Sequence, residues 1–563
     1  MMQKMTFINK KSIENIMTLD KMGSRYPSRL SFSRSMLRTM VKEKWQIKTA
    51  KFDLDKYGYG TVVYEVKTPK YLYSLICFSQ FLDDKERSDR VIAEKWDTAY
   101  TLHIGKISSK DYLRLKKNIP LQEAGRNSPK ELILSRANKS VRLFERVVES
   151  LSKGKQPNIE ELNDVGYLLR TTAVYGSGKF GLSDFERTSY KTHFDQPFRA
   201  EMLAVYLIRE FSIQLVEHVA YHRNPKKAVK LKNKIKQHLG IGNSTGLGMA
   251  PFVIKHPKLI HKWIKQFEET IKRIAKNEQI KKSTYNKYLL LLKKSQIYLD
   301  EVVTTDKIQK IKNKTAYKDL LKIVKYIKKV SFKNFTWKKL INFSKNNTCY
   351  DVQEIVKVQL IELYPKIADK LAEDMSISDE LIIKTDMLMI KLIKIIESNY
   401  NWAIKTNFKK KENSYLFWYI SEEKLEPRLG ERYNEPGANL EQPLGIGKMV
   451  NELYYFIHKQ NKNILKLNIA EFLLLYPQFR GIIRRIQTLA DYEYGEVKDN
   501  VLSKNVLPIN MLRFKLSFFG ASRYDPKSDR WLRVSFYSGA PFLENLNKKN
   551  VEEWGFSTMN SYK

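Results

Sequence analysis

Residues 192–225 contain no lysine, although 75 of the 563 residues are lysine and the rest of the chain carries them throughout. Asp195 can cap a helix here, Pro197 can open it, and Asn224–Pro225 can end it. The sequence therefore predicts one long helix over about 197–222. A solvent-facing helix in this chain would carry lysine. This helix is therefore either buried in the fold or presents a polar face used for chemistry.

The polar residues of this predicted helix fall on one side of it. Glu210, Gln214, His218 and His222 follow one another at four-residue spacing, and Glu217 lies beside them. Glutamate and histidine can be tuned toward neutral pKa values, so this face suits proton transfer. We take Glu210, Glu217 and His218 as candidate catalytic residues. The alternative is a buried helix whose polar stripe hydrogen-bonds to neighbouring helices.

The two histidines also suggest a metal. His218 and His222 are separated by four residues, a spacing at which two helical histidines can share one divalent ion. The order Glu-His-x-x-x-His differs from the His-Glu-x-x-His of zinc hydrolases. A metal-dependent oxygenase or hydrolase at these histidines remains an alternative hypothesis, with a divalent metal as its possible cofactor.

Arginine is unevenly distributed along the chain. Of its 26 arginines, only Arg273 lies between residues 224 and 427. Arginine suits places where a planar fork must grip a carboxylate or a phosphate. We therefore expect the arginine-bearing flanks to hold the site, and we select Arg170, Arg432 and Arg523 as anion-binding candidates. Arg432 lies in the Pro- and Gly-rich stretch 427–448.

Two glycine-rich stretches are candidates for backbone contact with a ligand. YGSGKFG (175–181) combines glycines with Lys179, which can cradle an anion. GIGNSTGLGMAP (240–251) adds Asn243 and Ser244 as polar groups. Neither stretch has the spacing of a phosphate-binding P-loop. The residues before position 240 have a helical pattern, so a dinucleotide-binding strand is not expected, and we predict a loop.

The net charge of +40 is large, and much of it lies in one segment. Residues 255–345 carry a net charge of +18. Such a surface attracts polyanions, so a nucleic-acid-binding protein is the second hypothesis, with Trp337, Phe335 and Tyr317 available for base stacking. The same charge also fits the Lys/Ile/Asn-rich composition of bacterial-like, AT-biased coding.

Residue patterning predicts an α+β, mainly α-helical fold. Alternating apolar residues over 47–105 indicate a small N-terminal antiparallel sheet, helical patterns follow from about 128, and the tail contains a short C-terminal β-hairpin. We divide the chain into an N-terminal α+β module, a helical core with Gly-rich loops, a Lys-rich helical segment and an Arg-rich part that closes on the core. Their ranges are 1–120, 121–261, 262–415 and 416–563.

These observations favour an enzyme of unassigned class that acts on a small anionic metabolite, a carboxylate or a phosphate, by acid/base chemistry. Five islands that depart from the Lys/Ile/Asn background would form one composite pocket. They are the helix 197–222, YGSGKFG (175–181), GIGNSTGLGMAP (240–251), the stretch 427–448 and the arginine-rich stretches 480–496 and 518–533. The two cysteines, Cys77 and Cys349, have no disulfide-framework or metal-site spacing, and we expect a reducing compartment. No apolar run reaches the length of a membrane span, so we expect a soluble cytoplasmic protein without a membrane partner. The sequence leaves the oligomeric state open.

Overall fold

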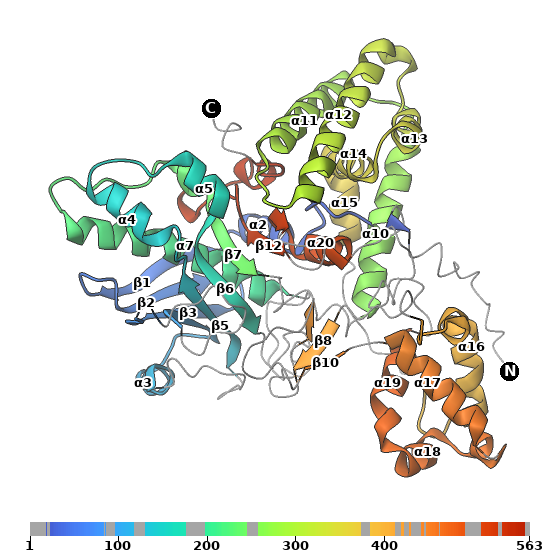
Figure 1. The fold of residues 1–563 in the computed structure, drawn as a ribbon. Coiled ribbons are helices and arrows are strands. Elements are labelled where there is room, and N and C mark those ends of the chain that lie inside the picture. Colours follow the sequence, from blue (N-terminus) through green and yellow to red (C-terminus); the bar gives the residue numbers. More distant parts are fainter. Residues whose placement is uncertain are drawn as a thin grey trace.

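The fold is α+β and mainly α-helical, as predicted (Figure 1). No described helix is both long enough and apolar enough to cross a bilayer. The computed structural model describes residues 18–19, 23–83, 85, 96–117, 130–175, 198–244, 257–372, 383–410, 418–421, 427–429, 441–443, 446–460, 462–489, 508–526 and 532–557.

The body is built on a sheet that contains nine strands in the described residues. Their order is β1-β2-β3-β4-β5-β6-β7-β12-β11, and every pair is antiparallel except β6–β7. The predicted N-terminal sheet corresponds to the first four strands. The predicted C-terminal hairpin is formed by β11 and β12, and its strand β12 also pairs with β7. The strands are β1 (Gln46–Leu54), β2 (Gly60–Lys67), β3 (Leu72–Ser79), β4 (Thr98–Ile104), β5 (Glu131–Lys139), β6 (Tyr167–Tyr175), β7 (Gly240–Ser244), β11 (Ala521–Pro526) and β12 (Leu532–Phe536).

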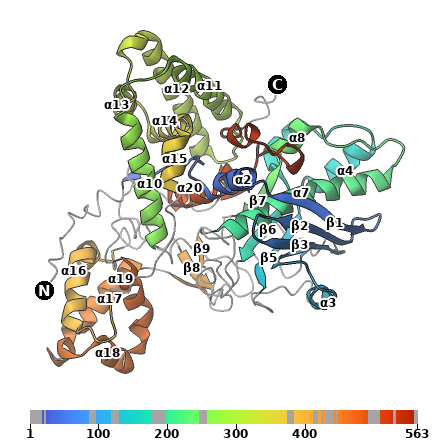
Figure 2. The same ribbon diagram turned by 180° about the vertical axis from the view of Figure 1, so that it is seen from behind.

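The predicted lysine-free helix exists as α7 (Arg199–Arg223). It crosses one face of the sheet and touches β3 through β7 (Figures 1 and 2). Its residues from Glu201 to Val216 are nearly all buried, which explains why lysine is missing there. Helices α2 (Phe32–Lys42) and α4 (Phe144–Ser152) pack against it.

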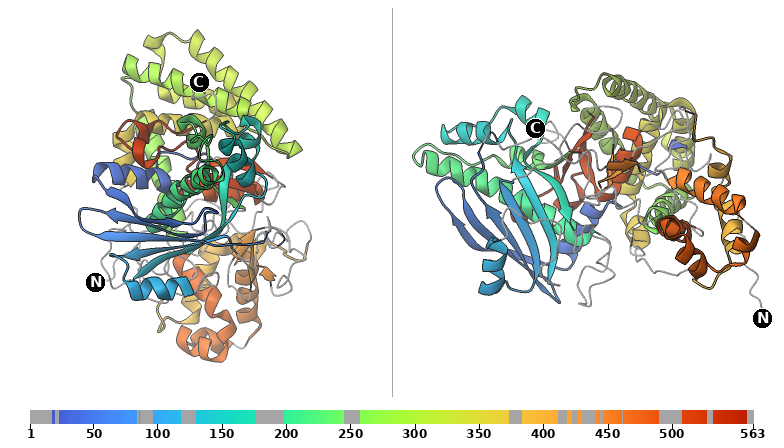
Figure 3. Two further views of the ribbon diagram at one scale, coloured as in Figure 1. Left: turned by 90° about the vertical axis from the view of Figure 1, so that its left-hand side faces the viewer. Right: turned by 60° about the horizontal axis from the view of Figure 1, so that its bottom comes forward.

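Two groups of helices lie beside the sheet (Figure 3). The first consists of α10 to α15 and has its own core, which includes Trp337 and Leu320. The second consists of α16 to α19 around Ile396 and Phe472. Their bounds are α10 (Pro257–Ala275), α11 (Lys282–Glu301), α12 (Lys307–Lys329), α13 (Trp337–Asn347), α14 (Tyr350–Leu363), α15 (Pro365–Ala372), α16 (Met389–Lys405), α17 (Ile446–Lys459), α18 (Ile469–Leu475) and α19 (Arg480–Leu489).

Shorter elements complete the described fold. A small three-stranded sheet has the order β10-β8-β9. Helix α20 precedes the C-terminal hairpin and α3 packs under β2 and β3, where Leu115 meets Phe78 and Ile76. The bounds are β8 (Trp418–Ser421), β9 (Pro427–Leu429), β10 (Glu441–Pro443), α3 (Ser109–Lys117), α5 (Ile159–Val165), α8 (Asn233–His238) and α20 (Pro508–Phe519).

Several local predictions were wrong. Residues 131–139 and 167–175 were expected in helices but form β5 and β6, and residues 240–244 were expected in a loop but form β7. Every residue of β5 is buried, so the strand lacks the alternation that marks a half-exposed strand. The tail from residue 511 was expected to form two strands around a turn, but its first part belongs to helix α20.

Candidate functional site: a basic cleft

A cleft of about 760 Å³ lies between residues 27–34, residues 548–556 and helix α11. Its walls come from the segment before and within α2, from the exposed side of α11, from the end of α14 and from residues 548–556. This volume is typical of small-molecule sites. We call it the basic cleft.

The lining of the basic cleft carries more positive than negative charge. Seven of its residues are basic and three are acidic, which gives a formal excess of four positive charges. An anion entering the cleft is therefore attracted by the walls. The basic residues are Arg29, Arg34, Lys287, Lys293, Lys294, Lys548 and Lys549, and the acidic ones are Glu362, Glu552 and Glu553.

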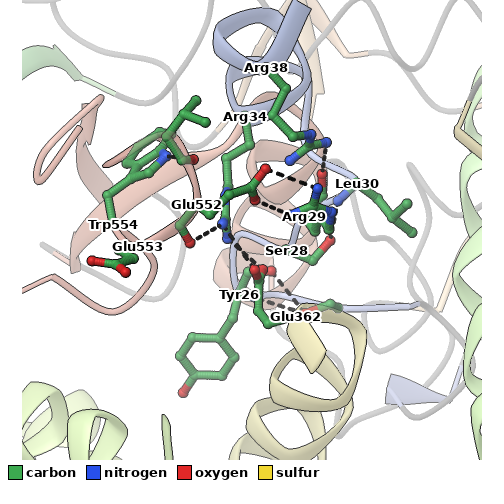
Figure 4. A network of polar contacts seen from close by, with 12 residues as sticks. Tyr26, Ser28, Arg29, Leu30, Arg34, Arg38, Glu362, Glu552, Glu553 and Trp554 are labelled. Carbon is green, nitrogen blue, oxygen red and sulfur yellow. Dashed lines mark hydrogen bonds and ion pairs between the residues drawn. The ribbon is translucent and has the colours of Figure 1, made fainter. Parts of the chain in front are cut away.

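Arg34 fixes one wall of the cleft. Its side chain is almost fully buried and forms a two-pronged ion pair with Glu362 at the end of α14, with Nη2 donating to Oε2 at 2.9 Å. Nη2 also donates to the carbonyl of Glu552 at 3.2 Å, and the guanidinium lies 5.7 Å from the ring centre of Trp554. One side chain on α2 thus joins α14 to the C-terminal segment (Figure 4).

Arg29 forms a second clamp one turn before α2. It bonds both carboxylate oxygens of Asp369, at 2.7 and 2.8 Å, and it also pairs with Glu552 (Figure 4). Although burial opposes ionisation, these hydrogen bonds raise the pKa of Arg29 above its usual value. Arg38 donates to the backbone carbonyl of Arg29 at 2.5 Å. These arginines are used largely in binding protein carboxylates, so the lysines are the cations left for a ligand.

Lys294 on α11 is the unusual cation of the cleft. Its Nζ donates to the backbone carbonyl of Glu553 at 2.5 Å, and no carboxylate of the described residues forms an ion pair with it. Burial, followed by the nearby positive charge of Arg34, lowers the pKa of Lys294 to about 8. Lys287 and Lys293, on the same helix, are exposed. Lys294 is half-buried, and a partly desolvated amine in a cleft with a perturbed pKa is typical of functional sites.

The predicted catalytic residue Glu210 lies behind a wall of the basic cleft rather than in its lining. Its Oε1 accepts the backbone N–H of Leu543 at 2.7 Å. The neighbouring Tyr206 donates to the carbonyl of Pro541 at 2.8 Å, and Arg209 donates to that of Ala540 at 3.0 Å. This part of α7 therefore holds the segment that supplies Gly539 and Pro541 to the cleft.

Glu210→Gln is expected to remove a pH dependence of stability. Burial raises the pKa of Glu210 to about 7. The folded protein thus retains a proton that the unfolded chain releases near pH 4.5, so stability falls as the pH rises from about 4.5 to 7. Glutamine keeps an oxygen for Leu543 and does not ionise. Urea unfolding at pH 5 to 8 measures the free energy of unfolding of both proteins. As the pH rises, the value for the variant should increase relative to that of the parent by up to about 1.4 kcal/mol per pH unit.

The control for this experiment is Glu160→Gln, because Glu160 is exposed. Its free energy of unfolding should depend on pH in the same way as that of the parent. An equal pH slope for Glu210→Gln and the parent would refute the buried, proton-retaining state of Glu210.

The other residues of the predicted Glu/His face contact different parts of the body. Glu217 accepts the backbone N–H of Leu231 at 3.0 Å and pairs with Lys236. His218 contacts the carbonyl of Asp55 at 2.7 Å, in the turn between β1 and β2. Glu210, Glu217 and His218 thus contact different segments of the chain, and none of the three lines the basic cleft.

The two predicted metal-binding histidines are neighbours. The ring centres of His218 and His222 lie 4.2 Å apart, and Nδ1 of His222 contacts the carbonyl of His218 at 3.0 Å. Among the described residues, no group of three or more His, Cys, Asp or Glu side chains is placed to hold a metal. A metal at this pair remains a hypothesis that needs a further ligand.

Arg523 lines a separate, small cavity of about 30 Å³ with His238 and Tyr298. It donates to the carbonyl of Leu162 at 3.5 Å. Burial, followed by the charge of Arg523, lowers the pKa of His238 to about 3. Gln237 and His238 are adjacent, and the first lines the basic cleft while the second lines this cavity, so the two spaces are neighbours.

Arg170 and Asn243 are buried in adjacent strands. Asn243 donates to Thr171 at 3.3 Å, and Arg170 pairs in register with Gly242. Ser244 ends β7, where it pairs with Arg533. Lys179 and Arg432 lie outside the described residues, as do most of the two glycine-rich stretches and of 427–448.

Sequence reasoning missed the residues that form the basic cleft. The stretch SRYPSRLSFSRSMLR contains Arg25, Arg29, Arg34 and Arg38 within 14 residues. The uneven distribution of arginine, already noted, was the signal that could have found them. Nothing in the local sequence distinguishes Lys294 from the other lysines of α11, because only the tertiary fold partly buries it.

Comparison with known proteins returned no match: no protein-family model, no curated protein and no solved structure matches this chain.

Proposed function

We propose that the protein is an enzyme that acts on a small anionic metabolite, a carboxylate or a phosphate ester, bound in the basic cleft. The observation that carries this proposal is the excess of positive charge on the walls of a cleft large enough for a metabolite. Charge-assisted hydrogen bonds from lysine would hold the anionic group. Arg29 and Arg34 would keep the walls in place through their carboxylate partners.

The cleft and the wall behind it each contain one group suited to acid/base chemistry. Lys294 exchanges its proton near pH 8, and Glu210, behind the wall formed by 539–543, exchanges one near pH 7. General acid/base catalysis is most effective when the pKa lies near the working pH. Lys294 is the group that reaches the cleft, so it takes the proton-transfer role in this proposal, and Glu210 is a positioning residue.

The nucleic-acid hypothesis is less well supported by the side chains. Trp337 and Phe335, expected to stack on bases, are buried in the core of the first helical group, and Trp337 donates to the hydroxyl of Tyr364. The predicted role of these two rings in base stacking is therefore wrong. Trp337 packs in the core from the apolar side of α13, and Phe335 does so from the residues between Asn334 and that helix.

Anion binding tests the proposal directly. We expect untagged protein to bind members of a panel of small carboxylates and phosphate esters in isothermal titration calorimetry. The double variant Lys287→Ala/Lys293→Ala should bind them about tenfold more weakly, a loss of about 1.4 kcal/mol. Both lysines are exposed at the cleft, so the fold should remain intact.

The matched control is Lys307→Ala/Lys310→Ala on α12, which removes the same charge at exposed positions outside the cleft lining. It should bind the anions as the parent does. Equal losses in the two double variants would show that net charge alone attracts the anions and would refute the proposal. RNA binding at low salt that only the α12 variant loses, without anion binding, would support the nucleic-acid hypothesis instead.

A further inference from the structure

We propose that Lys294 is a covalent catalyst: its amine condenses with the carbonyl group of a small anionic substrate, such as a 2-oxo acid, to form an imine. This inference rests on the proposed function, because it assumes that the basic cleft binds the anionic part of the substrate. It goes further by naming the substrate class and the atom that attacks it.

The surroundings of the Lys294 amine are the first support. Nζ is held by one neutral acceptor, the carbonyl oxygen of Glu553, at 2.5 Å. A lysine that serves only to pair with acid would lie against a carboxylate. Of the described carboxylates near it, Glu362 is bonded by Arg34 and Glu552 by Arg29. The charges of Glu362 and Glu553 act on the amine without forming an ion pair with it, and they only partly offset the lowering of its pKa by burial and by Arg34. The geometry thus holds the amine at the cleft without fixing its charge.

The positive charge of Arg34 is the second support. Arg34 is almost fully buried close to Lys294, and it disfavours a second cation nearby. With its pKa near 8, about a tenth of Lys294 is neutral at pH 7, as Henderson–Hasselbalch proportions require. An amine made nucleophilic by burial and by a neighbouring cation is an established route to imine-forming lysines.

The position of the amine relative to the exposed lysines gives the third support. Lys287, Lys293 and Lys294 all line the cleft from α11. The first two are exposed and remain available to bind a carboxylate. A 2-oxo acid carries its carboxylate next to the carbonyl carbon. Its carboxylate can therefore pair with an exposed lysine cation while its carbonyl carbon lies at the neutral amine of Lys294.

The chemical step balances within the protein and its substrate. The lone pair of neutral Nζ forms a bond to the carbonyl carbon, and the carbonyl π electrons move to oxygen. The resulting carbinolamine then loses the former carbonyl oxygen as water, which takes both amine hydrogens. The product is a carbon–nitrogen double bond at Nζ, and no oxidant or reductant is required.

Reductive trapping tests the inference. Full-length protein is incubated with pyruvate or glyoxylate and sodium cyanoborohydride, which reduces an imine to a stable secondary amine. Peptide mass spectrometry then measures the rate of labelling at each lysine. We expect Lys294 to be labelled at least tenfold faster than Lys287 and Lys293, with a rate that rises as the pH approaches 8. Lys294→Arg, which keeps the charge, should lose the fast phase while its thermal unfolding stays close to that of the parent.

The outcomes separate this inference from the proposed function. Labelling of Lys294 at the rate of the exposed lysines would overturn the inference, even if the cleft binds non-carbonyl anions such as succinate. Fast labelling of Lys294 by neutral propanal, with no preference for pyruvate and no competition by succinate, would keep the reactive amine but refute the anion-binding cleft.

Discussion

Arg34→Ala is expected to lower the free energy of unfolding by about 3–5 kcal/mol, the cost of removing one partner of a buried ion pair. Arg34 is about 2% exposed, and its removal leaves the Glu362 carboxylate without its fork of donors. The contact with the carbonyl of Glu552 is lost as well. Urea unfolding followed by tryptophan fluorescence measures the effect.

Two controls locate the cause of that loss. The double variant Arg34→Met/Glu362→Leu replaces both charges by apolar groups and should recover most of the stability. Arg146→Ala removes an exposed arginine that pairs with Glu161, and should cost less than about 1 kcal/mol. If Arg34→Ala lowers the free energy of unfolding no more than Arg146→Ala does, the stabilising role of the Arg34–Glu362 ion pair is refuted.

Gly240→Ala is expected to destabilise the protein by about 3 kcal/mol, at the upper end of the usual cost of overpacking. A β-carbon at position 240 would lie 2.4 Å from the backbone carbonyl oxygen of Phe536 in β12. Backbone in a sheet cannot move aside as a flexible side chain can. The substitution should therefore loosen the pairing of β7 with β12, which hydrogen exchange of the β12 amides would report alongside the thermal midpoint.

Gly481→Ala is the matched control, because a β-carbon there meets no atom within 4 Å and the residue lies in helix α19. It should be neutral or stabilising by up to about 1 kcal/mol, since alanine favours a helix over glycine. A Gly240→Ala protein as stable as the parent would show that the strands separate more easily at this point than the structure indicates.

The sequence predicted well those elements whose patterns are local. Helix α7 was expected from the absence of lysine and from Asn224 at its end, although its N-cap is Phe198 and the predicted cap Asp195 lies outside the described residues. Strands β1 to β4 were expected from the alternation over 47–105. β5 was missed because a strand buried on both faces loses that alternation. β7 was missed because GIGNS contains little of the residue chemistry that favours strands, and its pairing with β12 supplies the missing stabilisation.

The site was harder to predict for a related reason. The polar stripe on α7 was visible, but whether it contacts a ligand or the chain itself depends on segments such as 537–543, more than 300 residues away. The carboxylates that bind Arg29 and Arg34 are similarly distant in sequence. The charge pattern of the sequence predicted that basic residues bind an anion. Which basic residues line a cleft could be read only from the tertiary structure.

The position of β12 between β7 and β11 has a consequence for how the chain acquires its structure during synthesis. About 290 residues separate β7 from β12, its second partner in the sheet. At roughly 5–20 residues per second, a ribosome needs about 15–60 s to make them. During that time the nascent sheet has an open edge at β7, a ready template for pairing with another chain. We infer that the late arrival of one hairpin ends the interval in which this protein is most exposed to aggregation and to chaperone binding.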